Sequence, residues 1–390
     1  MNIGNQLVVY VILAMAVALV VSFLMTPVVK TFAYKVGAID VPKDARRMHK
    51  VPIPRLGGLA IFIGFMVSIL LFVPITPEIK SILLGAVIIV VLGVVDDIMA
   101  LPAMLKFVVQ IIAAAIPATH GVTIQAFSNP NIFSENLYWV LGSLSIPFTV
   151  LWIVAITNSV NLIDGLDGLA AGISAIASMT MFVLSVWAGR LDSAALSIAV
   201  VGSSLGFLRY NFHPASIFMG DSGSLTLGFA LGVSSLLSVT RFAGLTTIAV
   251  PLVISAVPIL DTFSAIVRRT RAHVSVGHAD RGHIHHRLMD EGYDQRQSVL
   301  LMYGWTALLC VGSILMTQVE TIPRILIFCA LLVLSMLFAR RLHLFEPVLL
   351  HHYDPKTGED ELVSPADAAF EEEARAQEAH HHGRHGRRAR

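Results

Sequence analysis

The chain has 390 residues, of which 55% are hydrophobic and only 14% are charged, and its formal net charge is +1. Soluble domains carry about 25% charged residues, so this composition argues against a soluble enzyme and indicates a protein that lies mostly in lipid. The net charge itself decides nothing about nucleic acid, and no nucleic-acid partner is predicted.

Eleven apolar segments follow one another along the chain, most of them close to the roughly 20 residues that a membrane helix needs. They cover 6–29, 56–73, 80–98, 105–122, 140–159, 168–187, 194–210, 223–239, 245–267, 298–318 and 323–341. The least certain of these predicted helices are 105–122, which contains Lys106, and 140–159, which contains Pro147. No Lys or Arg precedes the first segment, so we expect a retained helix there rather than a signal peptide. The predicted fold class is an all-α polytopic membrane protein.

Positive residues predict the orientation of these helices, because cytoplasmic loops are enriched in Lys and Arg. Two segments are strongly basic, and their members are Lys30, Lys35, Lys43, Arg46, Arg47, Lys50 and Arg55, then Arg268, Arg269, Arg271, Arg281, Arg287 and Arg296. Residues 123–137, by contrast, contain neither Lys nor Arg. An even number of helices separates the two basic segments, so they share one side. We therefore predict an outside N-terminus and a cytoplasmic C-terminus.

A change of composition near residue 345 divides the chain into a transmembrane domain at 1–344 and a cytoplasmic tail at 345–390. Residues 358–378 are acidic and rich in alanine, and 379–390 read AHHHGRHGRRAR. Because the tail has almost no apolar periodicity, it cannot bury a core and is expected to be disordered.

Acidic and amide side chains gather where the apolar segments end on the predicted cytoplasmic side. In chain order they are Asp96, Asp97, Asn158, Asn161, Asp164, Asp167, Asp221 and Asp261. Ionisable groups at a membrane are costly, so they are candidates for function. Clustered oxygen donors without thiolates favour Mg²⁺, and a basic loop facing them suits phosphate. This combination indicates phosphoryl transfer.

Structural alternatives remain open for the same residues. Asp96 and Asp97 could simply end a helix at the lipid headgroups. Asp164 and Asp167 could belong to a capped turn, since Asp-Gly pairs are common turn formers. Asp221 could be the N-cap of the next helix, with or without a second role as a ligand.

The histidines divide into two groups. His49, His120, His213 and His273 are interpreted as surface or packing residues. The other group is His283, His285 and His286. Together with Asp280 and Arg281, these histidines form a dense polar patch.

Five motifs, in this order, resemble those of the polyprenyl-phosphate N-acetylhexosamine-1-phosphate transferase superfamily, glycosyltransferase family 4. They are PRLGGLA (54–60), VVDD (94–97), NSVNLIDGLDGLAAG (158–172), FMGDSGSLTLGF (218–229) and HADRGHIHHRL (278–288). The resemblance covers roughly residues 1–341. Its HIHH form is similar to the undecaprenyl-phosphate GlcNAc-1-phosphate transferase branch. The lipid I synthase branch usually has three consecutive histidines, which this sequence lacks.

The resemblance implies a role for each matching position. Asp221 and Asn161 match metal-binding residues, for Mg²⁺ or Mn²⁺ in its place. Asp96 and Asp97 match the paired catalytic acids, and Asp96 is the better candidate for accepting the proton of the lipid phosphate. The positions expected to bind substrate are Asn158, Asp164, Asp167, Asp280, Arg281, His283, His285, His286, Lys106 and Arg55.

The expected activity is transfer of GlcNAc-1-phosphate from UDP-GlcNAc to undecaprenyl phosphate, starting a glycan such as teichoic acid or O-antigen. The expected place is a bacterial plasma (inner) membrane, with the active site cytoplasmic; a homodimer is compatible with it. Lipid I synthase is the main alternative. An ion-coupled transporter would place its acids near the midplane, not at one interface. A CDP-alcohol phosphatidyltransferase would carry Ala-Arg after the first Asp-Gly pair and a further Asp motif, both missing here.

Overall fold

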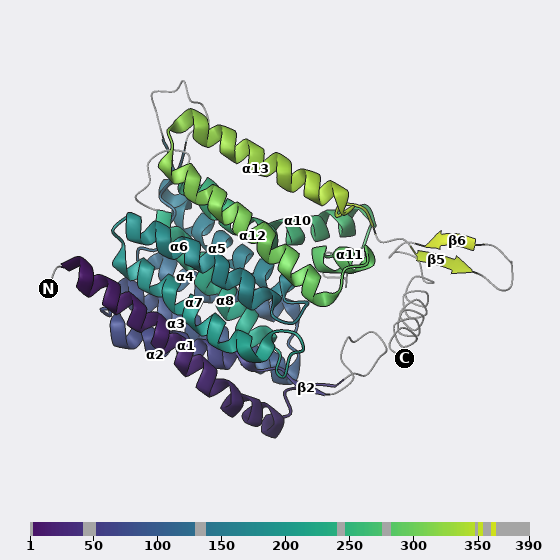
Figure 1. The fold of residues 1–390 in the computed structure, drawn as a ribbon, viewed down its shortest axis with the longest axis horizontal. Helices are drawn as coiled ribbons and strands as arrows, with labels where there is room; N and C mark the ends of the chain where they lie inside the picture. Colours follow the sequence, from purple (N-terminus) through teal and green to yellow (C-terminus); the bar gives the residue numbers. More distant parts are fainter. Residues whose placement is uncertain are drawn as a thin grey trace.

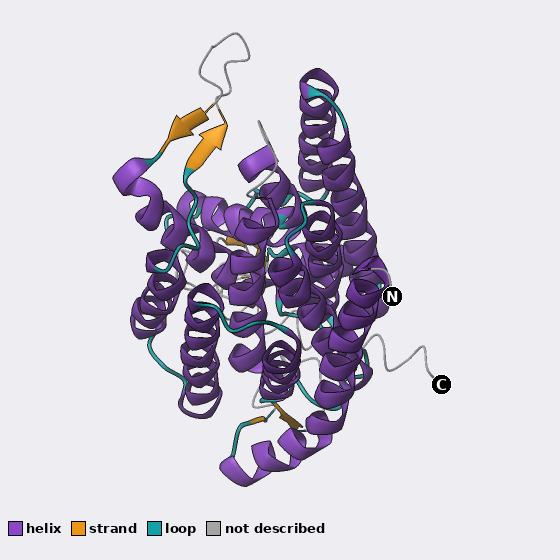
Figure 2. Ribbon diagram, turned by 90° about the vertical axis from the view of Figure 1, so that its left-hand side faces the viewer, coloured by secondary structure: helices purple, strands orange, loops and turns teal. Residues whose placement is uncertain are grey.

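The computed structural model describes residues 3–41, 52–128, 138–239, 246–274, 282–347, 350–353 and 360–363, and most of these residues are helical (Figures 1 and 2). The first helices are α1 (Ile3–Val36), α2 (Gly57–Phe72), α3 (Pro77–Met99), α4 (Ala103–Thr119), α5 (Ser145–Ile163), α6 (Leu169–Trp187) and α7 (Leu191–Asn211). They are followed by α8 (Gly220–Val239), α9 (Thr246–Ile254), α10 (Ala256–Arg271), α11 (Ile284–Asp290), α12 (Gln295–Gln318) and α13 (Thr321–Arg341). The prediction of an all-α polytopic membrane protein is confirmed.

Seven helical segments in the described residues are long and apolar enough to cross a membrane. They are Val9–Val36, Pro77–Met99, Gly142–Ile163, Leu169–Trp187, Leu191–Asn211, Gln295–Gln318 and Thr321–Arg341. Helices α2 and α4 are apolar but shorter. Pro147 lies in the first turn of α5, where a missing backbone N–H is tolerated.

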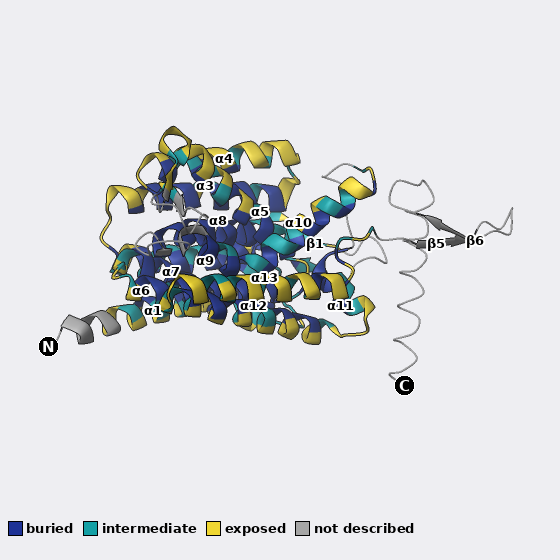
Figure 3. Ribbon diagram, turned by 90° about the horizontal axis from the view of Figure 1, so that it is seen from above, coloured by how far each residue is buried: buried dark blue, intermediate teal, exposed yellow. Residues whose placement is uncertain are grey.

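Helix α8 is the central helix of the bundle, and every residue from Ser222 to Ser238 is buried (Figure 3). It packs against α5, α3, α6 and α2. Its hydroxyl side chains bond to its own backbone: Thr226 donates to the Ser222 carbonyl and Ser238 to the Ser234 carbonyl. A helix with many small, internally satisfied side chains can therefore be surrounded by protein rather than lipid.

Glycines allow the backbones around the start of α8 to approach closely. A Cβ atom on Gly58 of α2 would overlap the backbone of Gly223, and one on Gly93 of α3 would overlap the backbone of Ser222. The PRLGGLA motif therefore has a packing function: it brings α2 against the first turn of α8.

Replacing Gly58 by alanine is expected to lower the unfolding temperature in detergent, because overpacking of this kind costs about 1–3 kcal/mol. Gly304→Ala in α12 is the matched control, since no atom lies within 4 Å of the Cβ it would add. Thermal unfolding of both variants measures the difference. Equal melting temperatures for Gly58→Ala and Gly304→Ala would contradict the packing role of Gly58.

The ninth apolar segment, 245–267, forms two helices rather than the single helix expected from the sequence. Helix α9 ends at Ile254 and α10 begins at Ala256, with Ser255 between them. Pro258 has no N–H to donate to the carbonyl of Ile254, so the helical hydrogen-bond ladder is interrupted there.

Strands occur only as short antiparallel pairs in the described residues. They pair β1 (Ile39–Asp40) with β2 (Ile53–Pro54), β3 (Ala126–Ser128) with β4 (Tyr138–Val140), and β5 (Leu350–Tyr353) with β6 (Asp360–Val363). The last pair belongs to the predicted tail, where the sequence suggested no strand. Apart from residues 345–347, the rest of the tail lies outside the described residues, and the domain division at 344 stays a prediction.

Candidate active site

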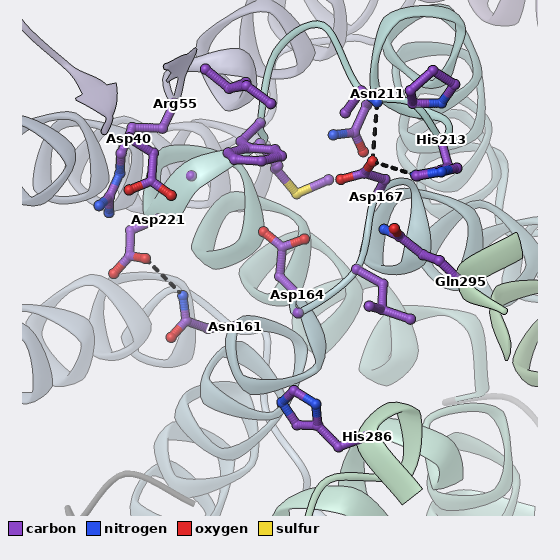
Figure 4. Close-up of a pocket in the computed structure, with 18 residues that line it drawn as sticks. Asp40, Arg55, Asn161, Asp164, Asp167, Asn211, His213, Asp221, His286 and Gln295 are labelled. Carbon is purple, nitrogen blue, oxygen red and sulfur yellow. Dashed lines mark hydrogen bonds and ion pairs between the residues drawn. The ribbon is translucent and has the colours of Figure 1, made fainter. Parts of the chain in front are cut away.

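A cavity of about 560 Å³ opens where the α5–α6 turn, the α7–α8 loop and the starts of α8 and α12 meet. Figure 4 shows Asp221 and Asn161 on one side of this cavity, Asp167 and His213 on the other, and Asp164 between them. The sequence-predicted residues that line it are Arg55, Asn161, Asp164, Asp167, Asp221 and His286. Motifs separated by more than 200 residues are thus brought to one place.

The carboxylate of Asp97 is enclosed and bound on both oxygens. Oδ1 accepts from the backbone N–H of Asp221 at 2.9 Å, and Oδ2 accepts from that of Ser222 at 3.0 Å. Arg55 donates to the same Oδ1 through Nε at 3.2 Å and Nη2 at 3.1 Å. Asp97 therefore holds the first turn of α8 and the guanidinium of Arg55, which lines the cavity.

The neighbouring Asp96 turns the other way, toward α4. Its Oδ1 accepts from the Leu101 N–H at 2.6 Å, and its Oδ2 lies 3.1 Å from Nζ of Lys106. The same ammonium lies 3.0 Å from Oδ2 of Asp221. One lysine thus bridges two carboxylates from different helices. Of these three residues, only Asp221 lines the cavity.

The two asparagines of the NSVN motif have different surroundings. Asn161 donates from Nδ2 to Oδ1 of Asp221 at 3.2 Å and to the Ser224 hydroxyl at 2.8 Å. Asn158 donates instead to the side chain of Gln110 in α4 and to the Val154 carbonyl. Only Asn161 lines the cavity, so the structure gives Asn158 a contact between helices rather than a place in the site.

The turn between α5 and α6 supplies two acids with different environments. Burial, with the carboxylates of Asp221, Asp97 and Asp167 nearby, raises the pKa of Asp164 to about 8. The shift favours the protonated form of Asp164, and a cation bound among these carboxylates would oppose it. Oδ2 of Asp167 accepts from the Ala215 N–H at 3.0 Å and lies 2.9 Å from Nδ1 of His213.

The HIHH motif forms the start of α11, and only its last histidine faces the cavity. His283 and His285 are both buried. Burial, with His286 and His283 beside it, lowers the pKa of His285 well below its usual value, so this ring is neutral. His286 lines the cavity. Asp280 and Arg281, predicted to bind substrate, lie outside the described residues.

Four polar residues that line the cavity were not assigned to it from the sequence. His213, interpreted from the sequence as a surface or packing residue, lines the cavity and pairs with Asp167. Asp40, Asn211 and Gln295 also line it. Asp261, one of the acids on the predicted cytoplasmic side, contacts His283 behind the cavity. The one available signal was the position of His213, five residues before the FMGD motif.

Comparison with known proteins gives a consistent assignment. The sequence profile of glycosyl transferase family 4 matches residues 79–239. A probable undecaprenyl-phosphate N-acetylglucosaminyl 1-phosphate transferase of Bacillus subtilis is 44% identical over 294 residues, 75% of this chain and 81% of the relative. A decaprenyl-phosphate N-acetylglucosaminephosphotransferase of Mycolicibacterium smegmatis is 35% identical over 325 residues, 76% and 79% of the two chains. A phospho-N-acetylmuramoyl-pentapeptide-transferase of Caldicellulosiruptor bescii is 31% identical over 327 residues, 79% and 98%.

Proposed function

The chain belongs to glycosyl transferase family 4, and we propose that it transfers N-acetylglucosamine 1-phosphate from UDP-N-acetylglucosamine to undecaprenyl phosphate or a similar polyprenyl phosphate. One observation carries this proposal: a cavity at one end of an apolar bundle is lined by several carboxylates and Arg55, and Lys106 pairs with the lining carboxylate of Asp221. The relatives at 44% and 35% identity are named for this kind of reaction, which supports it over lipid I synthase, represented at 31%. The product would start a cell-wall or surface glycan.

The proposed reaction exchanges one phosphoanhydride for another. An oxygen of the lipid phosphate attacks the β-phosphorus of UDP-GlcNAc, the bond from that phosphorus to the bridging oxygen breaks, and UMP leaves with the electron pair. The products are polyprenyl-diphospho-GlcNAc and UMP. Because little bond energy is lost, the protein mainly has to align two charged phosphates and shield their repulsion.

A magnesium ion, with manganese as its substitute, fits the donors at the Asp221 side. Mg²⁺ takes one or two protein carboxylates and completes its shell with water and phosphate, so the carboxylate of Asp221 with the neighbouring Asn161 amide oxygen would be sufficient. The ammonium of Lys106 between Asp96 and Asp221 supports a preference for positive charge at this place. Asp221 and Asn161 would hold the ion, which when bound would neutralise developing phosphate charge.

The chain's own residues then divide the remaining work. Arg55 and Lys106 bind phosphate oxygens, and Asp96 accepts or orients the proton of the lipid phosphate. Asp97 keeps Arg55 and the start of α8 in place. On the other side of the cavity, Asp167 and His213 face the nucleoside, and Asp164 lies between the two regions. His286 faces the sugar phosphate.

The protein is a multi-pass membrane protein of a bacterial cell, and we place its active site on the cytoplasmic side, where nucleotide sugars occur. The basic residues near the site, including Arg55, Arg268 and Arg287, support this orientation. Eleven crossings, an outside N-terminus and a cytoplasmic C-terminus follow if each apolar segment spans the bilayer once.

The orientation predicts opposite accessibility for two single cysteines in a background with Cys310 and Cys329 replaced by serine. A cysteine replacing exposed Tyr293, between α11 and α12, is expected to react with an impermeant thiol reagent only from the cytoplasmic side. A cysteine replacing exposed Gln125 is expected to react only from outside. Labelling of intact cells and of inverted vesicles measures both. The reverse pattern would put the site on the wrong face for its donor.

Release of UMP tests the proposed reaction itself. Purified protein in detergent, supplied with UDP-GlcNAc and Mg²⁺, is expected to release UMP only when polyprenyl phosphate is added. A panel of other UDP-sugars, including UDP-MurNAc-pentapeptide, provides the controls. Transfer of the pentapeptide substrate, with no turnover of UDP-GlcNAc, would make the chain a lipid I synthase instead.

A further inference from the structure

One face of α10 carries a polar stripe directly behind the HIHH motif. Asp261, Ser264 and Arg268 are spaced by three and four residues, so they lie on the same side of the helix. All three are buried, with Asp261 and Ser264 fully enclosed and Arg268 2% exposed. The Arg268 guanidinium donates to the Ser264 hydroxyl at 2.9 Å, and that hydroxyl donates to the Asp261 carbonyl at 2.9 Å. A buried stripe of this kind is costly unless its groups are paired.

Both carboxylate oxygens of Asp261 bond to the start of α11. Oδ2 lies 2.8 Å from Nδ1 of His283, and Oδ1 accepts from the backbone N–H of Ile284 at 2.8 Å. His283 is the residue before the helix, and Ile284 is its first residue. One side chain on α10 therefore determines both the position of the first turn of α11 and the orientation of the His283 ring.

The three imidazole rings of the motif contact one another in a row that leads from Asp261 to the cavity. The rings of His283 and His285 stack with centroids 5.8 Å apart and an interplanar angle of 8°. His285 and His286 lie closer, at 4.3 Å and 43°. His286 then lines the cavity. His285 is wedged against Gly165 of the α5–α6 turn, where any Cβ would overlap the ring. The stack thus joins α10 to the acidic turn of the site.

Arg268 contacts the residue that precedes His283. A Cβ on Gly282 would overlap the Arg268 side chain, so the residue before His283 packs directly on it. Arg268 also donates to the Leu344 carbonyl, and Arg271 and Arg287 donate to the next two carbonyls, those of Phe345 and Glu346. The chain just beyond α13 is thereby fastened to α10 and α11.

We propose that Asp261 is a positioning residue for donor binding: its carboxylate fixes α11 so that the histidine stack presents His286 to the cavity. This rests on the proposed function, because it assigns His286 to the sugar-phosphate side of the donor. Asp261 touches no substrate. Its effect on the reaction passes through His283 and His285 to His286, and the lipid acceptor does not depend on it.

A double-mutant cycle tests whether Asp261 acts through His286. Asp261→Ala loses both bonds and is expected to reduce kcat/KM for UDP-GlcNAc about 50-fold, mainly through KM, since bonds to a charged group are the strong ones. Asp261→Asn keeps an acceptor for Ile284 and should lose only about fivefold. In a His286→Ala background, Asp261→Ala and Asp261→Asn should each reduce kcat/KM for UDP-GlcNAc by less than about twofold. KM for polyprenyl phosphate should stay constant, and Asp192→Asn, half-exposed at the start of α7, is the control.

Hydrogen exchange of the full-length protein provides a readout that does not require turnover. The amides of α11 are expected to exchange faster in Asp261→Asn, while those of α12 stay unchanged. Unchanged exchange in α11, equal losses in both His286 backgrounds, or a parallel rise of both KM values would overturn the assignment. Faster exchange in α11, with a wild-type protein that transfers no sugar phosphate, would instead overturn the proposed function and leave the positioning role standing.

Discussion

Asp221→Ala is expected to abolish sugar-phosphate transfer, with kcat reduced by about 10³-fold or more, while the protein still inserts and folds. The reason is electrostatic: the variant loses the carboxylate proposed to hold the metal ion, and charge neutralisation is worth several kcal/mol in the transition state. Asp221 is also the partner of Lys106 and Asn161, so its removal releases both. The measurement is UMP release over a range of Mg²⁺ concentrations.

Two comparisons make the Asp221 result specific. Asp221→Asn keeps the size of the side chain and should recover part of its rate at high Mg²⁺, because one oxygen donor remains. Asp192→Ala, half-exposed at the start of α7, should behave like wild type. Near-normal turnover of Asp221→Ala at saturating Mg²⁺, with an unchanged melting temperature, would remove Asp221 from the metal site.

Asp96→Asn is expected to reduce kcat by about 10²–10⁴-fold at pH 5, the range for loss of a general base. The deficit should shrink as the pH rises. The second pKa of a phosphate monoester lies near 6, so the lipid phosphate is mostly monoanion at pH 5 and mostly dianion at pH 8, and about tenfold of the lost rate should return over that range. Asp97→Asn is the matched control, because Asp97 holds α8 and Arg55 rather than a substrate proton. The reduction of kcat in Asp97→Asn should therefore stay the same at high pH.

The same proposal excludes a covalent intermediate on Asp96. Wild-type protein incubated with UDP-GlcNAc labelled in the β-phosphate, without lipid acceptor, should carry no label after denaturation and should release no UMP. Stoichiometric labelling would show that an aspartate attacks first, and direct attack by the lipid phosphate would be wrong.

The sequence by itself determined the class and the family, and it predicted a set of site residues. Apolar runs long enough to span a bilayer are a local property, so most helices were predicted within a few residues. The family and its branch were predicted from motifs in fixed order, and the comparisons confirm both. Basic residues also gave an orientation, which stays a prediction. The prediction of a single helix over 245–267 was wrong, because Pro258 in that segment interrupts the helical hydrogen bonds.

Tertiary structure alone decided which of these residues meet. Asp96 and Asp97 are adjacent, yet neighbours on a helix point about 100° apart, so one faces Lys106 and the other the start of α8. Asn158 and Asn161, one turn apart on α5, have partners on two different helices, Gln110 of α4 and Asp221 of α8. His213 with Asp167, and Asp261 with His283, are pairs 46 and 22 residues apart. Such contacts depend on how separate helices pack, and no local pattern of residues encodes that packing.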